Sequence, residues 1–245
     1  MDDLRRKYLG AMGIDVWVRR GAAPAKASAP PPDAPAAAIV SEPATSDVAS
    51  MDWEALQATV AQCNRCAELI ANRRQTVFGV GDRGADWLVI GEAPGADEDR
   101  QGEPFVGRAG KLLNNMLWAI GLAREQVYIA NILKCRPPKN RDPKPQEAAA
   151  CEGYLRRQIA LIRPKIILVV GRVAAQHLLG TDRPIGRLRG EVRRYDDLPM
   201  VVTYHPAYLL RSPLEKRKVW DDLRLAQTTY RAAVAALNAS APERE

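Results

Sequence analysis

The sequence predicts an α/β protein, a three-layer α/β/α domain around a central, mainly parallel sheet of four strands. Three observations support this prediction. Four short apolar runs are rich in Ile, Leu and Val, which is typical of strands buried on both faces. Stretches with helical periodicity separate these runs, and alternating strands and helices favour a parallel sheet covered on both sides. The 245 residues also suffice for one full core with segments to spare.

The first fifty residues do not fit this pattern. Residues 1–20 combine apolar side chains with flanking basic residues, as a short amphipathic interaction motif would. Residues 21–50 are rich in Ala and Pro without periodicity, which predicts a disordered linker. We therefore expect the folded domain at residues 51–238 and a tail at residues 239–245.

The first half of the domain supplies two strands. Asp52 can cap a helix that carries Trp53, Leu56 and Val60. Residues 86–91 form the first apolar strand, and a helical pattern follows around Leu113. Residues 127–132 form the second strand, followed by a basic loop broken by prolines at residues 134–145.

The second half supplies the other two strands. We expect a helix at residues 145–162, a strand at 165–170, a helix at 173–179 and a strand at 199–204. A last amphipathic helix, marked by Trp220, Leu223, Tyr230, Val234 and Leu237, closes the domain. The loops after the first, second and fourth strands should meet at one edge of the sheet, where α/β proteins bind ligands.

Charge and hydropathy narrow the class of protein. The formal net charge of +7 favours a polyanionic partner, although such an excess is common on other proteins. No apolar run approaches the length of a membrane span, and the N-terminus lacks the apolar segment of a signal peptide. We therefore expect a cytoplasmic protein without a membrane partner.

The four cysteines have the spacing of metal ligands. Cys63 and Cys66 form a C-x-x-C pair, and Cys135 and Cys151 follow at a distance. In a chain without an export signal, such cysteines are ligands or free thiols more often than disulfides. Four thiolates suit either zinc or an iron–sulfur cluster, and the spacing does not separate the two.

A glycine-rich stretch follows the first strand. It begins with Gly91, Glu92 and Ala93 and presents one aromatic side chain, Phe105, among small residues. The glycines allow a ligand to approach the main chain closely. An acidic surface loop with a packed Phe is the alternative interpretation.

Three separated segments together resemble the family 4 uracil-DNA glycosylases of bacteria and archaea, which carry a 4Fe-4S cluster. They are GEAPGADEDRQGEPFVGRAGKLL from Gly91, IANILKCRPPKNRDPKPQEAAAC from Ile129, and YHPAYLLR from Tyr204. The resemblance covers residues 51–230 and includes all four cysteines. It implies a DNA-repair glycosylase that flips uracil out of DNA and hydrolyses its N-glycosidic bond, and a monomeric, nucleoid-associated bacterial protein.

The resemblance also implies roles for the residues of the pocket. Phe105 would stack on the flipped base and Asn131 would read its Watson–Crick edge. His205 would donate a hydrogen bond to uracil O2 as charge develops there. Glu92 would position water or shape the loop so that Gly91 and Ala93 contact uracil. Cys63, Cys66, Cys135 and Cys151 would hold the cluster.

Further residues are candidates for contacts with DNA. Leu209 or Leu210 would supply the apolar wedge that fills the gap left by the flipped base. Basic residues near the pocket are candidates for phosphate contacts. They are Lys134, Arg136, Lys139, Arg141, Lys144 and Arg211.

Two other functions are compatible with parts of the sequence. One is the relative that stays attached to the abasic sugar through a histidine in an inserted basic loop. This chain has only His177 and His205, and neither lies in that loop, so we expect turnover. The other is a non-catalytic, metal-containing nucleic-acid-binding protein.

The N-terminal motif carries a second resemblance. The segment RRKYLGAMGIDVWVRR is similar to the N-terminal peptide of the psi subunit of DNA polymerase III. We therefore expect residues 1–20 to dock on the replicative clamp loader.

Overall fold

The computed structural model describes residues 45–240. The predicted clamp-loader motif at residues 1–20 and the predicted linker up to residue 44 lie outside the described residues. So do residues 241–245 of the predicted tail.

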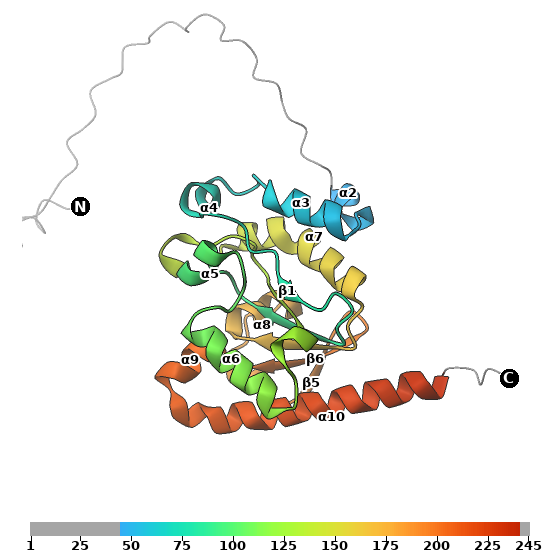
Figure 1. Cartoon of the computed structure of the whole chain (residues 1–245). Coiled ribbons are helices and arrows are strands. Elements are labelled where there is room, and N and C mark those ends of the chain that lie inside the picture. Colours follow the sequence, from blue (N-terminus) through green and yellow to red (C-terminus); the bar gives the residue numbers. More distant parts are fainter. Residues whose placement is uncertain (1–44, 241–245) are drawn as a thin grey trace, which may run out of the picture. The chain divides into compact units, whose positions relative to one another are not determined.

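A six-stranded sheet forms the centre of the fold (Figure 1), in the order β1-β3-β2-β4-β6-β5. The four middle strands are parallel to one another, as predicted. Two antiparallel edge strands, β1 and β5, were missing from the prediction. The strands are β1 (Val80–Gly81), β2 (Trp87–Gly91), β3 (Tyr128–Asn131), β4 (Ile166–Val170), β5 (Val192–Tyr195) and β6 (Leu198–Thr203).

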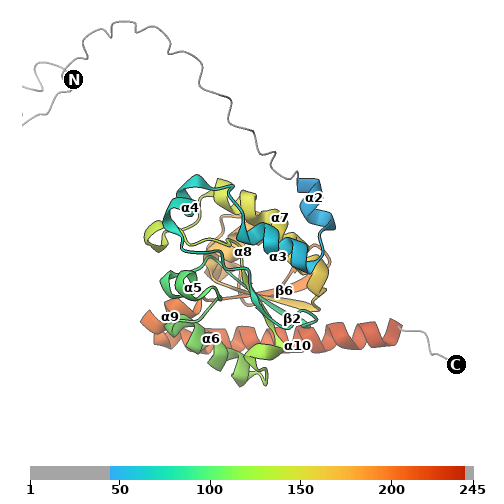
Figure 2. The ribbon, with the colours of Figure 1, turned by 45° about the horizontal axis from the view of Figure 1, so that its top comes forward.

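Helices cover both faces of this sheet, which confirms the three-layer prediction (Figures 1 and 2). The strands alternate their side chains between two cores: Leu88 and Ile90 face one, and Trp87 and Val89 face the other. The first core is closed by α2 (Thr45–Ser50), α3 (Trp53–Ala61), α4 (Ala67–Asn72), α7 (Pro145–Ile162) and α8 (Arg172–Leu179). The second is closed by α6 (Arg108–Ala119), α9 (Pro206–Arg211) and α10 (Lys216–Ser240).

The start of the folded domain differs from the prediction. Asp52 caps α3 as expected, because its Oδ1 accepts a hydrogen bond from Ala55 N at 2.8 Å. Residues 45–50, however, form the helix α2 and are not part of a structureless linker. Val48 of this helix is only 1% exposed and belongs to the first core. The fold therefore begins at least six residues before the predicted boundary.

Short helical pieces lie in the connections between the longer elements. They are α5 (Ala96–Gln101), η1 (Arg124–Gln126), η2 (Pro138–Asn140), η3 (Ile185–Arg187) and η4 (Pro213–Glu215). In the described part of the chain, no helix has the length and apolar character that crossing a bilayer requires.

The register of the parallel strands brings their carboxyl ends together. Gly91 at the end of β2 is opposite Asn131 at the end of β3. Val170 at the end of β4 is opposite Thr203 at the end of β6, two residues before His205. The residues that follow these strands therefore gather at one edge.

Candidate active site

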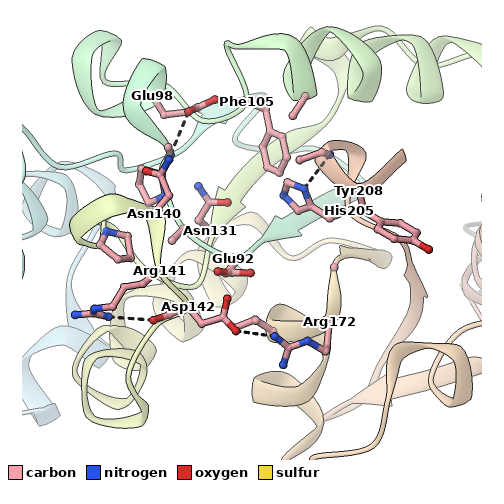
Figure 3. Close-up of a pocket in the computed structure, with 18 of the residues that line it drawn as sticks. Glu92, Glu98, Phe105, Asn131, Asn140, Arg141, Asp142, Arg172, His205 and Tyr208 are labelled. Carbon is pink, nitrogen blue, oxygen red and sulfur yellow. Dashed lines mark hydrogen bonds and ion pairs between the residues drawn. The ribbon is translucent and has the colours of Figure 1, made fainter. Parts of the chain in front are cut away.

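A cavity of about 750 Å³ opens at this edge of the sheet (Figure 3). This is within the usual size range of small-ligand sites. The predicted site residues Glu92, Ala93, Phe105, Asn131 and His205 all line it. The structure therefore brings together the side chains that the sequence separates by more than a hundred positions.

Gly91 lies beneath the pocket and makes this convergence possible. A Cβ atom at this position would lie 2.4 Å from Asn131 Oδ1 and 2.7 Å from Phe105 Cζ. Such distances are far below van der Waals contact, so any side chain here would push the two residues apart. The ring centroids of Phe105 and His205 are 5.5 Å apart. The three predicted side chains thus surround a single small volume.

Asn131 is held at the floor of the pocket with one polar atom unused. Its side chain is 2% exposed, and its Oδ1 is buried without a hydrogen-bond donor among the described residues. Its main-chain oxygen accepts a hydrogen bond from Lys134 Nζ at 2.9 Å. A buried acceptor without a partner is costly in a folded protein and suggests a ligand donor.

His205 has a defined tautomer. It is the N-cap of α9, and its Nδ1 accepts a hydrogen bond from Ala207 N at 3.1 Å. Burial, together with the positive charge of Arg211, lowers the pKa of His205 to about 4. The imidazole is therefore neutral at pH 7 and carries its proton on Nε2, which is free to donate.

Glu92 follows β2 and has a carboxyl group with an unusual pKa. Burial is the main cause and the negative charge of Asp142 a further one, partly offset by Arg172, and together they raise this pKa to about 7. A carboxyl group with a pKa near neutrality is suited to accept a proton or to orient water.

The loop that carries Phe105 is held from both sides. Phe105 itself has φ +55°, a left-handed conformation that is strained for a residue with a side chain. From one side, Glu98 accepts hydrogen bonds from the main-chain nitrogens of Gly95 and Val106, both at 3.1 Å. From the other side, Arg124 donates to the carbonyl oxygen of Phe105 at 3.3 Å.

Sequence reasoning missed an ion pair at the rim of the pocket. Arg172, the first residue of α8, pairs with Asp142 of the basic loop at 2.6 Å (Figure 3). Both residues line the pocket. The sequence could have indicated Arg172, because it is a charged residue directly after the Gly171 turn at the end of β4. The prediction, however, took only the ends of the first, second and fourth strands as parts of the site.

The predicted wedge is narrowed to one leucine. Leu209 is 1% exposed and packs in the second core, so its burial disfavours it among the two predicted alternatives. Leu210 is 41% exposed and remains available. On α9 the two neighbouring residues point in different directions, which the sequence alone did not distinguish.

The predicted phosphate contacts differ in their surroundings. Lys134 is 1% exposed and donates to Gln158 Oε1 at 2.6 Å, so the prediction that it contacts phosphate is wrong. Arg141 is bound by the carboxylate of Glu147 at 2.6 Å and so already has an anionic partner. Lys144 pairs with Glu68. Arg136, Lys139 and Arg211 stay predicted contacts.

The four cysteines come from three parts of the fold. Cys63 and Cys66 lie between α3 and α4, Cys135 follows β3, and Cys151 lies in α7. All are free thiols and all pack against the first core. Burial raises the pKa of Cys66, and the nearby Cys135 and Cys63 raise it further. In residues 45–240, no three His, Cys, Asp or Glu side chains are already arranged around a single ion.

A positively charged side chain donates a hydrogen bond to one of these thiols. Arg73 Nη1 donates a hydrogen bond to Cys135 Sγ at 2.7 Å. Hydrogen bonds and positive charge next to thiolates stabilise an anionic metal centre. Four thiols from three segments, with a guanidinium against one of them, fit an iron–sulfur cluster chemically.

Comparison with known proteins decides the family. The model of the uracil DNA glycosylase superfamily matches residues 78–224, which contain every residue that lines the pocket as well as Cys135 and Cys151, but not Cys63 and Cys66. The chain belongs to this superfamily. The predicted fold and the predicted family are thereby confirmed.

Relatives within the superfamily are similar over most of the domain. The type-4 uracil-DNA glycosylase of Archaeoglobus fulgidus is 44% identical over 173 residues, which cover 67% of this chain and 86% of the relative. That of Thermotoga maritima is 39% identical over 71% of this chain and 93% of the relative. A type-5 uracil-DNA glycosylase of Thermus thermophilus is 31% identical over 53% of this chain. These matches favour a glycosylase over the non-catalytic alternative.

Proposed function

We propose that this chain hydrolyses the N-glycosidic bond between uracil and deoxyribose in DNA and leaves an abasic site. One observation carries this proposal: Phe105, Asn131 and His205 converge on a single pocket beside Gly91. The type-4 relatives support the same activity. The described domain would carry this activity. Three points stay predictions: the location in the cytoplasm and nucleoid, the monomeric state, and the clamp-loader contact of residues 1–20.

The pocket suits uracil better than cytosine. Uracil presents the N3–H donor and the O4 acceptor, which match the Oδ1 and Nδ2 atoms of Asn131. The N3–H group would satisfy the buried Oδ1 that has no partner in the described chain. Cytosine presents an acceptor at N3 and a donor at N4. The Oδ1 acceptor of Asn131 would then face another acceptor, and its Nδ2 donor would face another donor. Sites that hydrogen-bond a substrate in this way reject mismatched analogues strongly.

His205 is suited to stabilise the leaving base. As the glycosidic bond breaks, its electron pair moves onto the uracil ring and negative charge develops at O2. The Nε2–H of His205 would donate to that oxygen, and the loss of one such donor typically costs about 10²- to 10³-fold in rate. The neutral state follows from the hydrogen bond to Nδ1 and from burial.

Glu92 is suited to orient the water that attacks the deoxyribose. The deoxyribose becomes cation-like in the transition state, and water adds to its C1′ atom. An ionised Glu92 at the pocket wall would orient this water and oppose the developing positive charge. Glu92 lines the pocket and its carboxyl group has a pKa of about 7, which together favour the positioning of water over a role in shaping the loop.

The four cysteines would hold a 4Fe-4S cluster, the group that the resemblance to the family 4 enzymes implies. When bound, the cluster would act structurally by fastening the segment of Cys63 and Cys66 to Cys135 and to α7. The same Cys135 segment follows β3, which ends at Asn131. Arg73 would support the site through its hydrogen bond to Cys135 Sγ.

The direct test is release of uracil by the purified chain. An oligonucleotide with one deoxyuridine is incubated with the protein and scored for alkali-labile breaks. We expect breaks with the wild type and strong losses for Asn131→Ala and His205→Ala. His177→Gln is the matched control, because His177 is outside the pocket lining. Absence of breaks, or unchanged activity in the two pocket variants, would refute the proposal.

A further inference from the structure

Large apolar side chains gather on the surface next to the pocket. In residues 45–240, three of the eight exposed large apolar residues fall within positions 208–214. Tyr208 is 36% exposed, Leu210 is 41% exposed and Leu214 is 91% exposed. Single exposed apolar residues are common, but a group at the mouth of a binding pocket indicates an interaction surface.

Leu214 stands on a rigid tip. It is the middle residue of η4, which connects α9 to α10. Ser212 N donates to Tyr208 O at 2.9 Å, and Glu215 N donates to Ser212 O at 3.1 Å. Pro213 fixes the backbone just before Leu214. The tip is therefore held in place although the Leu214 side chain itself is almost fully exposed.

Basic side chains next to this tip give it the charge that a DNA-binding surface requires. Arg211, Lys216 and Arg217 are exposed, and within residues 45–240 no hydrogen bond or ion pair binds their side chains. Tyr208 and Arg211 of α9 line the pocket, and η4 contacts α9, so the apolar tip is adjacent to the pocket. An apolar projection with a positive collar fits a ligand with a negatively charged backbone and an apolar interior.

We propose that Leu214 is a second wedge that, together with Leu210, enters double-stranded DNA beside the extruded nucleotide. This inference rests on the proposed function. Extrusion of a base costs its stacking and pairing, and an inserted apolar side chain offsets that cost. A single strand has no partner base to replace and its bases unstack easily. The contribution of Leu214 is therefore specific to duplex substrates.

The test compares two substrates that differ only in the complementary strand. Single-turnover rates are measured for the full chain on a single-stranded oligonucleotide with one deoxyuridine and on its duplex. We expect Leu214→Ala to reduce the duplex rate about 10-fold and to change the single-strand rate less than about twofold. Leu214→Met, which keeps an apolar side chain of similar length, should restore most of the duplex rate. Trp118→Ala, which removes an exposed aromatic on α6, should change neither rate.

The outcomes separate this inference from the proposed function. If the wild type releases uracil and Leu214→Ala lowers both rates equally or neither, Leu214 is no wedge and the proposed function stands. If Leu214→Met fails to restore the duplex rate, an apolar contact with DNA is likewise refuted. If the wild type releases uracil from neither substrate, both proposals fall.

Discussion

One local hydrogen bond determines which ring nitrogen of His205 carries the proton. Its Nδ1 accepts from Ala207 N because α9 begins at Pro206, so the ring caps the helix. The start of a helix also disfavours a positive charge. Position 205 was predictable from the strand end and the family motif. The tautomer was not, because it depends on where α9 begins.

Glu92 gives a prediction for the pH dependence. Its pKa is raised to about 7, so the carboxylate is mostly ionised above this pH and protonated below it. If the ionised form positions water, kcat/KM should rise with pH up to about 7 and then level off. His205, with a pKa of about 4, stays neutral throughout this range.

Glu92→Gln is the variant that tests this assignment. We expect it to lower kcat/KM by about 10²-fold and to remove the rise near pH 7. The measurement is a pH–rate profile under single-turnover conditions. A profile of unchanged shape in Glu92→Gln would assign the rise to another group.

Leu209 and Leu210 form a matched pair for a second prediction. Leu209 is 1% exposed in the core, and Leu209→Ala should destabilise the fold by about 2–5 kcal/mol. Leu210 is 41% exposed, so Leu210→Ala should leave the free energy of unfolding nearly unchanged and reduce activity on duplex DNA. Denaturant titration and a duplex assay measure both effects. The reverse pattern would contradict the assignment of Leu210 as a wedge.

For single residues, the sequence predicted which residues line the pocket better than it predicted which side chains are buried. Asn131 and Phe105 were identifiable because they follow strands within distinctive motifs. The burial of Lys134 was not, because its partner Gln158 lies 24 positions away on α7. A basic loop composition suggested phosphate contact, but packing of β3 against α7 turned this lysine inward.

The loop that carries Phe105 is the element on which the pocket depends most. Its left-handed residue persists because Glu98 and Arg124 hold the neighbouring main chain. Gly110 permits the close packing of this loop on α6, since a Cβ there would lie 1.7 Å from Phe105 O. The stacking face is thus positioned by contacts outside the pocket.

Arg124→Ala should therefore reduce activity, although the Arg124 side chain acts through the loop and not through contact with the substrate. Arg124 also donates to Pro104 O at 2.6 Å, so the variant removes two restraints from the strained turn. We expect kcat/KM to fall about 10-fold because small displacements of positioning groups are costly. Lys111→Ala on exposed α6 surface is the control. Unchanged activity of Arg124→Ala would show that the loop keeps its shape without this contact.

At the scale of elements, long apolar runs were predictable and short polar pieces were not. The four central strands are mostly apolar and β4 consists of Ile, Leu and Val alone, whereas β5 contains two arginines and β1 has two residues. These edge strands form only because β3 and β6 offer free edges. The helix α2 follows Ala- and Pro-rich sequence, and its packing on the first core was not visible in composition.

The whole molecule joins the cysteine site to the pocket. Cys63 and Cys66 lie between α3 and α4, Cys135 follows β3 and Cys151 lies in α7. Because β3 ends at Asn131, the segment of Cys135 leads directly from the pocket. The sequence predicted the ligand set from spacing and resemblance. It did not predict Arg73 as a partner of Cys135, since that contact joins residues 62 positions apart.

Cys135→Ser tests this coupling. We expect the purified variant to contain less iron per chain, to lose visible absorbance and to unfold at a lower temperature, because one of the fastening points is lost. Iron analysis and thermal denaturation measure these effects. Full iron content with an unchanged unfolding temperature would contradict a role of Cys135 as a ligand.

The most direct measurement of the central claim is a crystal structure of the chain with free uracil. We predict a uracil ring against the face of Phe105, its N3–H on Asn131 Oδ1 and its O2 within hydrogen-bond distance of His205 Nε2. A uracil bound elsewhere, or bound in this pocket without contact to Asn131 and His205, would contradict the account.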